Sequence, residues 1–449
     1  GLELEYDELL TGSPGEMVIE RDPNGRTIPA GRHHRTPAVP GDDLVLTLDR
    51  ALQYYVEQAL AAQVERMGAK AGIAIVMNPA NGEVLALANI GRAPAADGTQ
   101  TGPPIPIGNN RALTEVFEPG SANKVITVTA ALEEGIVEPS TVLTVPDNLQ
   151  VADHRFTDHD PHPTGEWSVT EIMARSSNIG TIMLGQELGK ERLDEYMRRF
   201  GFGETTGLGF PSESAGLLLD PDNWSGTSIG TIPLGQGISV TAMQLLSAYN
   251  VIANGGVYVA PKLVGATVDE HGTQEPAPPA ERRRVVSETT AHAVRDMMVA
   301  VVEHGTGTAA AIEGYHVAGK TGTARKPLPE GGYRDAAGNY HYVATFAGFV
   351  PAENPQLSVI VEIDEPSATI FASGASAPLF ADISTHALRM FRIPPPAAGE
   401  QLIVPELSGE IDPNAASDVA GGRRNPPPTT VEPVADDGAT TTTTTTTTG

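Results

Sequence analysis

The sequence predicts an α+β fold in which helices flank a central antiparallel sheet. Strand-like patterns occur as a pair over residues 72–88 and again as a series after about residue 314. Helical patterns dominate between about 112 and 310. A hairpin at the start and a meander at the end form one antiparallel sheet if the first and last strands meet in space.

The first elements follow from spacing and turn residues. Residues 1–45 are polar and rich in turn signals, which favours the end of a preceding small domain or a linker. After Asp49, apolar residues at helical spacing predict an amphipathic helix. These residues are Leu52, Tyr55, Val56, Ala59, Leu60 and Val64. The apolar runs 72–77 and 83–88 are joined by a turn sequence and predict a β-hairpin.

The C-terminal part returns to strands, which are predicted at 316–318, 342–350 and 357–363. Beyond Pro394 the chain is rich in Pro, Asp and Thr, a composition that buries too little apolar surface to offset the entropy of ordering. We therefore expect three parts. They are a preceding segment at 1–45, one large domain at 46–393 and a disordered tail at 394–449.

Composition limits the function classes. A formal charge of −27 argues against non-specific binding to nucleic acids or anionic membranes, because both need a basic surface. The absence of cysteine excludes disulfides, thiol catalysis and cysteine-ligated zinc. No apolar run is long enough to span a membrane, and no signal peptide opens the chain. The sequence is expected to be a piece of a longer protein.

The first motif that carries chemistry is S-x-x-K, formed by Ser121 and Lys124 after Pro119 and Gly120. Because the apolar segment 125–132 predicts a buried helix, Ser121 lies near a helix N-terminus and Lys124 follows on the same side. A serine hydroxyl needs a base to become a nucleophile. A lysine serves as that base when burial and nearby cations lower its pKa. By itself, the pattern more often marks a capping serine and a solvated lysine.

The second motif is S-x-N, formed by Ser176 and Asn178 between helical runs at 169–174 and 179–188. Taken alone, it is best interpreted as a helix–helix turn, because Ser and Asn favour caps. The functional interpretation brings a hydroxyl and an amide together in a cleft. There they pass protons and hold a substrate amide.

The third motif is K-T-G-T. On a strand, Lys320 and Gly322 point to one side, and Thr321 and Thr323 point to the other. Gly322 has no side chain, so a substrate could lie against the strand at this position. Because the chain has few lysines, a chance K-T-G is infrequent.

The set S-x-x-K, S-x-N and K-T-G, in this order, is the active-site signature of penicillin-recognising serine enzymes. Over residues 46–393 the flanking sequences resemble class B penicillin-binding proteins, and residues 1–45 resemble the end of that family's β-rich pedestal domain. The segments that carry the resemblance are 117–121, 175–180, 200–203, 235–241, 317–324 and 346–351. The implied fold is the penicillin-binding transpeptidase fold.

The resemblance implies that Ser121 attacks the carbonyl of the penultimate D-alanine of a stem peptide, with Lys124 as base. Ser176 and Asn178 relay protons and orient the substrate. The implied substrate-binding residues are Lys320, Thr321, Gly322 and Thr323. Of these, Lys320 and Thr321 meet the terminal carboxylate, and backbone N–H groups of Ser121 and Thr323 form the oxyanion hole. An amine from a neighbouring strand then captures the acyl-enzyme. Neither a metal nor an organic cofactor is implied.

The same resemblance implies the partners. They are peptidoglycan stem peptides, with a D-Ala-D-Ala donor and a diamino-acid acceptor, and β-lactam antibiotics as substrate mimics. Members of the family are anchored in the cell membrane by one upstream helix, and their catalytic domain is extracytoplasmic. Segments 200–203 and 235–241 are more similar to septal than to elongation enzymes. We therefore expect a divisome glycosyltransferase and other division proteins as partners.

Other interpretations remain open. Ser228 lies in a G-x-S-x-G pattern, but no apolar strand precedes it, as a hydrolase nucleophile elbow requires. A group of acidic and histidine residues could ligate a metal, although a solvated loop near the cleft explains it better. Its members are Asp153, His154, Asp158, His159, Asp160 and His162.

Two further alternatives keep the fold. In a β-lactamase or a β-lactam sensor, the acyl-enzyme is hydrolysed or acts as a signal. The sequence lacks the Glu-x-x-Leu-Asn segment that class A lactamases use, so slow deacylation is expected. A wall-binding scaffold without chemistry is disfavoured by intact Ser121, Lys124 and Lys320.

Overall fold

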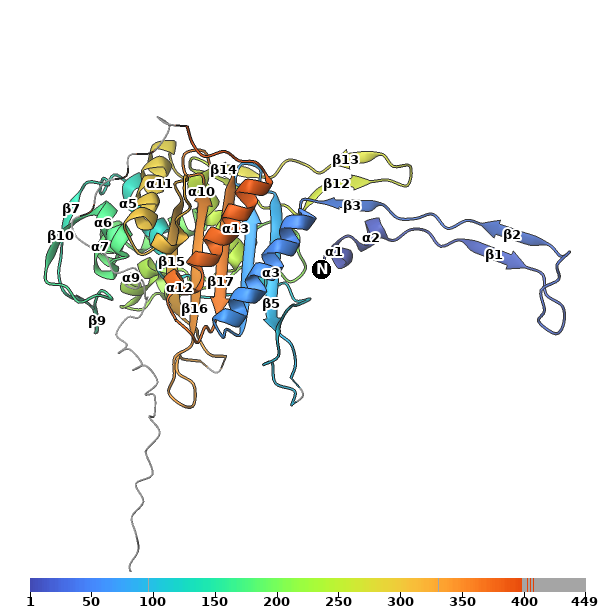
Figure 1. Cartoon of the computed structure of the whole chain (residues 1–449), viewed down its shortest axis with the longest axis horizontal. Helices are drawn as coiled ribbons and strands as arrows, with labels where there is room; N and C mark the ends of the chain where they lie inside the picture. Colours follow the sequence, from blue (N-terminus) through green and yellow to red (C-terminus); the bar gives the residue numbers. More distant parts are fainter. Residues whose placement is uncertain (96, 330, 398–401, 403, 405–406, 408–449) are drawn as a thin grey trace, which may run out of the picture.

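The computed structural model describes residues 1–95, 97–329, 331–397, 402, 404 and 407, and its centre is a six-stranded antiparallel sheet (Figure 1). The strand order is β15-β16-β17-β4-β5-β6. The strands are β4 (Ala71–Met77), β5 (Val84–Arg92), β6 (Pro104–Pro106), β15 (Ala318–Arg325), β16 (Tyr342–Val350) and β17 (Leu357–Asp364). Because β17 pairs with β4, opposing Ile360 to Ile75, the predicted meeting of early and late strands is confirmed.

Helices cover both faces of this sheet, which confirms the α+β prediction. Side chains alternate between the faces: Ile360 of β17 joins one apolar core, whereas Val359 and Val361 join the other. On the second face lie α3 (Arg50–Arg66), η4 (Thr308–Ala310), α12 (Ala372–Ala375) and α13 (Ala377–Met390) (Figure 1). The predicted helix after Asp49 is α3, and the Asp49 side chain caps it by accepting from the N–H groups of Ala51 and Leu52.

The first face carries the larger helical layer, which holds the first two motifs. Its main helices are α4 (Arg111–Thr114), α5 (Lys124–Glu133), α6 (Val169–Arg175), α7 (Asn178–Leu188), α8 (Lys190–Arg199), α10 (Ala242–Ala253) and α11 (Glu288–Glu303). Its short turns are η1 (Gly120–Asn123), η2 (Pro221–Asn223), α9 (Ser228–Thr231) and η3 (Ile232–Leu234). Helices α5, α10 and α11 are buried along most of their length.

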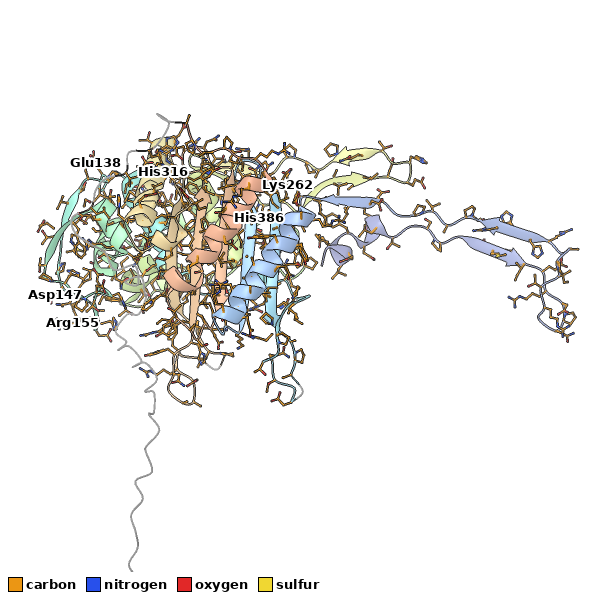
Figure 2. All side chains as sticks on the ribbon, viewed as in Figure 1. Glu138, Asp147, Arg155, Lys262, His316 and His386 are labelled. Carbon is orange, nitrogen blue, oxygen red and sulfur yellow. The ribbon has the colours of Figure 1, made fainter. Side chains whose placement is uncertain are left out.

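Two small ribbons border this layer. They are β7 (Val142–Val145) with β10 (Gly165–Ser168), and β8 (Leu149–Val151) with β9 (His154–Phe156). Arg155 is on the second ribbon, at the end of the molecule opposite the extended ribbon of residues 16–36 (Figure 2).

The N-terminal segment extends away from this body (Figure 1). After α1 (Leu2–Glu5) and α2 (Asp7–Leu10), strands β1 (Glu16–Ile19) and β2 (His33–Thr36) form an isolated ribbon. Strand β3 (Asp43–Leu46) then joins a small sheet with β12 and β13. The remaining strands are β11 (Val257–Val259), β12 (Val264–Val268), β13 (Gln274–Pro276) and β14 (Arg282–Arg284).

The structure corrects the bounds of one predicted strand and describes little of the predicted disordered tail. The strand predicted at 316–318 is wrong in its bounds, because β15 begins at Ala318 and continues through the K-T-G-T motif to Arg325. The predicted disorder of 394–449 falls largely outside the described residues. Among the residues that are described, no helix is both long and apolar enough to cross a membrane.

Candidate active site

Ser121 and Lys124 lie where a 3-10 turn passes into a buried helix. Ser121 is the second residue of η1 and Lys124 is the first of α5. Both side chains are shielded from solvent, with exposed fractions of 1% and 0%. The turn is held from outside, because Asn123 Nδ2 donates to Ile232 O at 2.9 Å and Tyr249 OH donates to Ala122 O at 2.9 Å. The two motif residues therefore occupy a fixed, water-poor position.

The Lys124 amine lies against the S-x-N motif. Its Nζ donates to Ser176 O at 2.6 Å, to Asn178 Oδ1 at 2.7 Å and to Ser176 Oγ at 3.2 Å. These contacts join segments more than fifty residues apart in the chain. The first two motifs thus form one polar cluster, as the functional interpretation of each requires.

The S-x-N motif owes its shape to the junction of two helices. Helix α6 ends at Arg175, and Ser176 follows as its C-cap with a left-handed backbone (φ 56°) that is uncommon for a residue with a side chain. Ser177 then caps α7 by accepting from Gly180 N–H at 3.0 Å. This turn leaves Ser176 Oγ and Asn178 Oδ1 directed at the same amine.

Strand β15 supplies the third motif on the sheet edge nearest the cluster. Lys320 Nζ donates to Ser176 Oγ at 2.9 Å, so two lysines from different elements share one hydroxyl. On the other side of the strand, Thr321 Oγ1 bonds Thr306 Oγ1 at 3.0 Å, and Thr323 Oγ1 accepts from Ala372 N–H at 3.2 Å.

Gly322 is where β15 approaches the Ser121 turn. A Cβ atom built at Gly322 would lie 2.8 Å from Pro119 O and 3.4 Å from Ala122 N. Only glycine allows strand and turn to come this close. All three motifs therefore converge on one place.

Comparison with known proteins agrees with this geometry. A family model described as the penicillin binding protein transpeptidase domain matches residues 72–385. "Penicillin-binding protein PbpB" of Mycolicibacterium smegmatis is 37% identical over 408 residues, covering 88% of this chain and 62% of the relative. "Probable peptidoglycan D,D-transpeptidase PenA" of Neisseria flavescens is 36% identical, covering 88% and 94%. The chain belongs to the class B penicillin-binding proteins.

Solved structures give the same result for the fold. Penicillin binding protein 3 of Mycobacterium tuberculosis in complex with aztreonam superposes with a TM-score of 0.72 at 34% identity, covering 88% of this chain and 90% of that one. A peptidoglycan synthetase of Bifidobacterium adolescentis gives 0.77 at 28% identity, covering 90% and 71%. The predicted penicillin-binding transpeptidase fold is confirmed. The chain spans about three fifths of the length of the PbpB proteins it matches.

Sequence reasoning missed Asp158 as a site residue of this class B penicillin-binding protein. Its carboxylate accepts from Ser177 Oγ at 2.7 Å and from the N–H groups of Asn178 and Ile179 at 2.5 and 2.9 Å. His162 Nε2 lies 3.1 Å from the same carboxylate. Asp158 thereby fixes the start of α7, which carries Asn178.

The interpretation of this segment as a solvated loop is wrong for Asp158 and His162. The Asp158 side chain is only 8% exposed and the His162 side chain only 14%. Burial alone would raise the pKa of Asp158, but hydrogen bonds from His162, Ser177 and Ile179 outweigh it and lower that pKa. The bond to Asp158 raises the pKa of His162. Within the described ranges, no three His, Cys, Asp or Glu side chains are grouped to hold a metal ion.

Ser228 lacks the surroundings of a hydrolase nucleophile. It starts the four-residue α9, and the turn η2 precedes it in place of a strand. Its hydroxyl bonds Ser225 Oγ at 3.0 Å and accepts from Ser225 N–H at 2.9 Å. The G-x-S-x-G pattern is therefore a local turn in this penicillin-binding protein.

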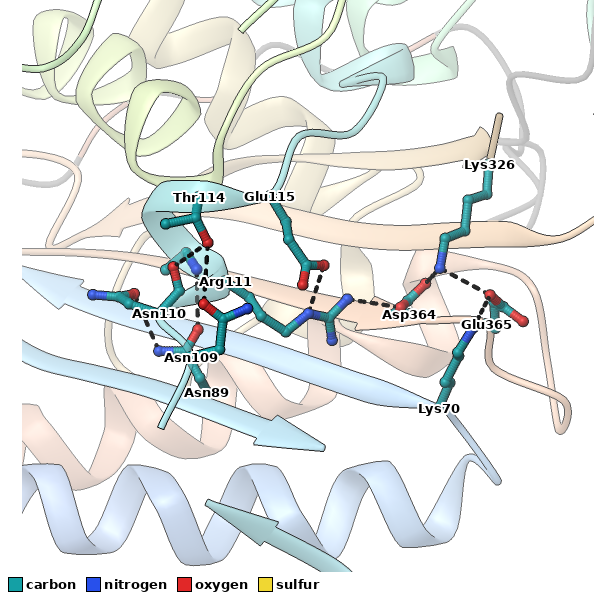
Figure 3. Close-up of polar contacts among 11 residues, drawn as sticks. Lys70, Asn89, Asn109, Asn110, Arg111, Thr114, Glu115, Lys326, Asp364 and Glu365 are labelled. Atoms are coloured by element: carbon teal, nitrogen blue, oxygen red, sulfur yellow. Dashed lines mark hydrogen bonds and ion pairs between the residues drawn. The ribbon is translucent and has the colours of Figure 1, made fainter. Parts of the chain in front are cut away.

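A charged network braces the sheet beside the segment that leads to Ser121 (Figure 3). Arg111 of α4 donates to Glu115 at 2.7 Å and to Asp364 of β17 at 2.8 Å. Lys326, just beyond β15, bonds Asp364 at 2.7 Å and Glu365 at 2.8 Å. The network ties the end of β15 to β17 and to α4. Its members carry no short sequence motif, so only the fold reveals them.

Proposed function

We propose that this chain is the catalytic part of a peptidoglycan D,D-transpeptidase that works through a serine acyl-enzyme. The observation that carries the proposal is the shared contact of Lys124 and Lys320 with Ser176 Oγ, at 3.2 and 2.9 Å, beside the buried turn of Ser121. Three separate motifs meet there, which a chance occurrence of any one of them does not explain. The family's relatives that are named D,D-transpeptidases support the same activity.

In acylation, Ser121 Oγ attacks the carbonyl carbon of the penultimate D-alanine, and its proton passes to Lys124 Nζ. A neutral amine can accept this proton while still donating to Ser176 O and Asn178 Oδ1. Burial and the neighbouring Lys320 cation both favour that neutral form. The bond to the terminal D-alanine then breaks, and its nitrogen takes a proton through the Ser176 hydroxyl.

The oxyanion that forms on the carbonyl oxygen is held by the backbone N–H groups of Ser121 and Thr323, each contributing about 3 kcal/mol to transition-state stability. Lys320 and Thr321 receive the terminal carboxylate, and Gly322 leaves room for the peptide along β15. An acceptor amine next attacks the acyl carbon. The ester bond breaks and the amine proton returns to Ser121. No cofactor takes part in these steps.

The biological setting follows from the family. We infer that the complete protein is anchored in the cell membrane by one upstream helix, with this domain on the cell-wall side. The segments 200–203 and 235–241 favour a septal role, in which a divisome glycosyltransferase and other division proteins are partners. Localisation of the complete protein to the division site, by a fluorescent fusion, tests this role.

The activity is tested by labelling the purified chain with a fluorescent penicillin and mapping the labelled peptide. We expect a stable label on Ser121. Ser121→Ala should abolish the label, and Ser228→Ala, the matched control, should keep it. A label on Ser228, or none, contradicts the proposal, whereas rapid loss of the label through turnover indicates a β-lactamase.

A further inference from the structure

Two buried titratable groups beside the S-x-N motif, Asp158 and His162, have no part in the proposed reaction steps. Both lie in the loop 157–164 between β9 and β10, with side chains only 8% and 14% exposed. The Asp158 carboxylate accepts from the Ser177 hydroxyl and from the first two N–H groups of α7, which begins at Asn178. A carboxylate enclosed in this way is costly to keep charged without a nearby cation. The identity of that cation therefore bears on the site.

The loop also orients the amide of Asn178. Its Nδ2 donates to Thr157 O at 3.1 Å, and its Oδ1 accepts from Lys124 Nζ at 2.7 Å. Because Thr157 O can only accept, the amide oxygen is the atom turned toward the amine. The adjacent Asp158 carboxylate accepts from Asn178 N–H at 2.5 Å. The loop 157–164 thus holds Asn178 by both its backbone and its side chain.

His162 has acceptors at both of its ring nitrogens. Nδ1 lies 2.7 Å from Pro163 O, and Nε2 lies 3.1 Å from Asp158 Oδ2. A neutral imidazole has one N–H group and can satisfy only one of these acceptors, whereas the imidazolium satisfies both. The bond to Asp158 raises the pKa of His162, which acts in the same sense. The geometry is therefore that of a charged histidine.

Charged and titratable groups from several elements lie around this pair and its motif. They are Lys124 of α5, Arg175 of α6, Lys320 of β15, and His159 and Asp160 of the loop itself. The His162 ring packs on the indole of Trp167 with centroids 4.4 Å apart, and the Arg175 guanidinium lies 4.9 Å from the centre of the same indole. These contacts hold the imidazole in its place beside Asp158.

Asp158 and Lys124 influence each other's charge. Burial would raise the pKa of Asp158, but the bond from His162 and the charge of Lys124 lower it. The attraction is mutual, so an uncompensated Asp158 carboxylate favours the ammonium form of Lys124. The proposed reaction needs the neutral amine. A cation at His162 compensates the carboxylate and so weakens this demand on Lys124.

We propose that the His162 imidazolium is the counter-ion of Asp158, and that this pair positions Asn178 while leaving Lys124 able to lose its proton. The inference rests on the proposed transpeptidase function and adds two positioning residues to it. Both act through the start of α7 and the Lys124 amine. Removing one of the two charges should therefore shift the pH dependence of acylation, and removing the other should shift it in the opposite direction.

The test measures the rate constant for acylation of Ser121 by benzylpenicillin between about pH 5 and 10, which gives the midpoint of its rise with pH. In His162→Gln, Lys124 is left to balance Asp158, so the midpoint should rise by about one pH unit. In Asp158→Asn it should fall by about one unit, and this shift is read separately from any loss of maximal rate. The double variant, which lacks both charges, should return close to the unaltered midpoint. A purely structural role does not produce opposite shifts that cancel.

His292→Gln is the matched control, because it removes an exposed histidine of α11 that lies 3.9 Å from the Glu288 carboxylate, outside the site. Its midpoint should equal that of the unaltered chain. NMR of the ring nitrogens gives an independent measurement on the unaltered chain, in which the signal missing from His162→Gln identifies His162. Both of its nitrogens should be protonated at about pH 7.

A neutral His162 at that pH overturns the inference. Midpoints that stay unchanged, or that move the same way in both single variants, overturn it as well. These outcomes leave the transpeptidase proposal intact. The absence of acylation at Ser121 in the unaltered chain overturns the transpeptidase proposal itself.

Discussion

At the scale of single residues, Glu362 on β17 has a protonation state governed by burial. Its side chain is almost fully enclosed, and its Oε2 atom has no hydrogen-bond partner among the described residues. Burial raises its pKa to about 8, although the charge of Arg111 opposes that rise. Glu365, three residues on, behaves in the opposite way. Burial would raise its pKa too, but bonds from Lys326 and Lys70 lower it to about 2.

These two carboxyls predict opposite pH effects on stability. Between about pH 4.5 and 8, folded Glu362 keeps a proton that the unfolded chain has released, so its contribution to stability is lost as pH rises through 8. Glu362→Gln should therefore be more stable than the unaltered chain by ~1–3 kcal/mol at pH 9, with little difference near pH 4.5. Urea unfolding at several pH values measures this difference.

Glu365→Gln is the matched control. Its carboxylate contributes stability above about pH 4.5, and this contribution is lost as pH falls toward 2. The variant should be less stable than the unaltered chain at neutral pH and converge with it in acid. A pH-independent effect of Glu362→Gln would contradict the assignment of a buried, protonated carboxyl.

At the scale of elements, the approach of β15 to η1 decides how well the site is assembled. An added methyl group at Gly322 meets the backbone oxygen of Pro119, which cannot rotate away. Gly322→Ala should slow acylation by benzylpenicillin at least tenfold and lower the free energy of unfolding by ~1–3 kcal/mol. Stopped-flow labelling and urea unfolding measure the two effects.

Gly265→Ala on β12 serves as the control, because its new Cβ atom would meet only ordinary contacts of 3.5 Å or more. It should acylate at the normal rate. A normal acylation rate in Gly322→Ala would show that strand and turn separate without functional cost.

Elements with clear periodicity were predictable, and contacts between loops were not. The spacing from Leu52 to Val64 predicted α3, and the paired apolar runs predicted the hairpin of β4 and β5. The left-handed backbone of Ser176 depends on how α6 meets α7, which no local pattern records. Asp158 lies in a segment without periodicity, and its role arises only where the loop folds against α7.

At the scale of the whole molecule, the body and the N-terminal ribbon are separate in structure. The strands β1 and β2 are exposed along almost their whole length, and the ribbon begins where Ser13 pairs with Val39. The division of the chain at residues 46 and 393 stays a prediction. The ribbon nevertheless offers a direct test of how independent the body is.

Replacing residues 14–38 with Asn-Gly should preserve the pairing of Ser13 with Val39 through a two-residue hairpin turn. Because the removed side chains are mostly exposed, we expect the acylation rate to stay within about twofold and the melting temperature within about 4 °C. Labelling with penicillin and thermal unfolding check both values. A collapse of acylation would mean that the ribbon supports the catalytic body.

The pairing of β17 with β4 has a consequence for how the protein is made. As the nascent chain emerges, the hairpin of β4 and β5 comes first, and β4 presents an open hydrogen-bonding edge until residues 357–364 arrive. Such distant pairing slows folding, and an uncovered edge invites aggregation during the delay. A defect in β17 therefore postpones assembly of the entire reaction centre, including the residues synthesised long before it.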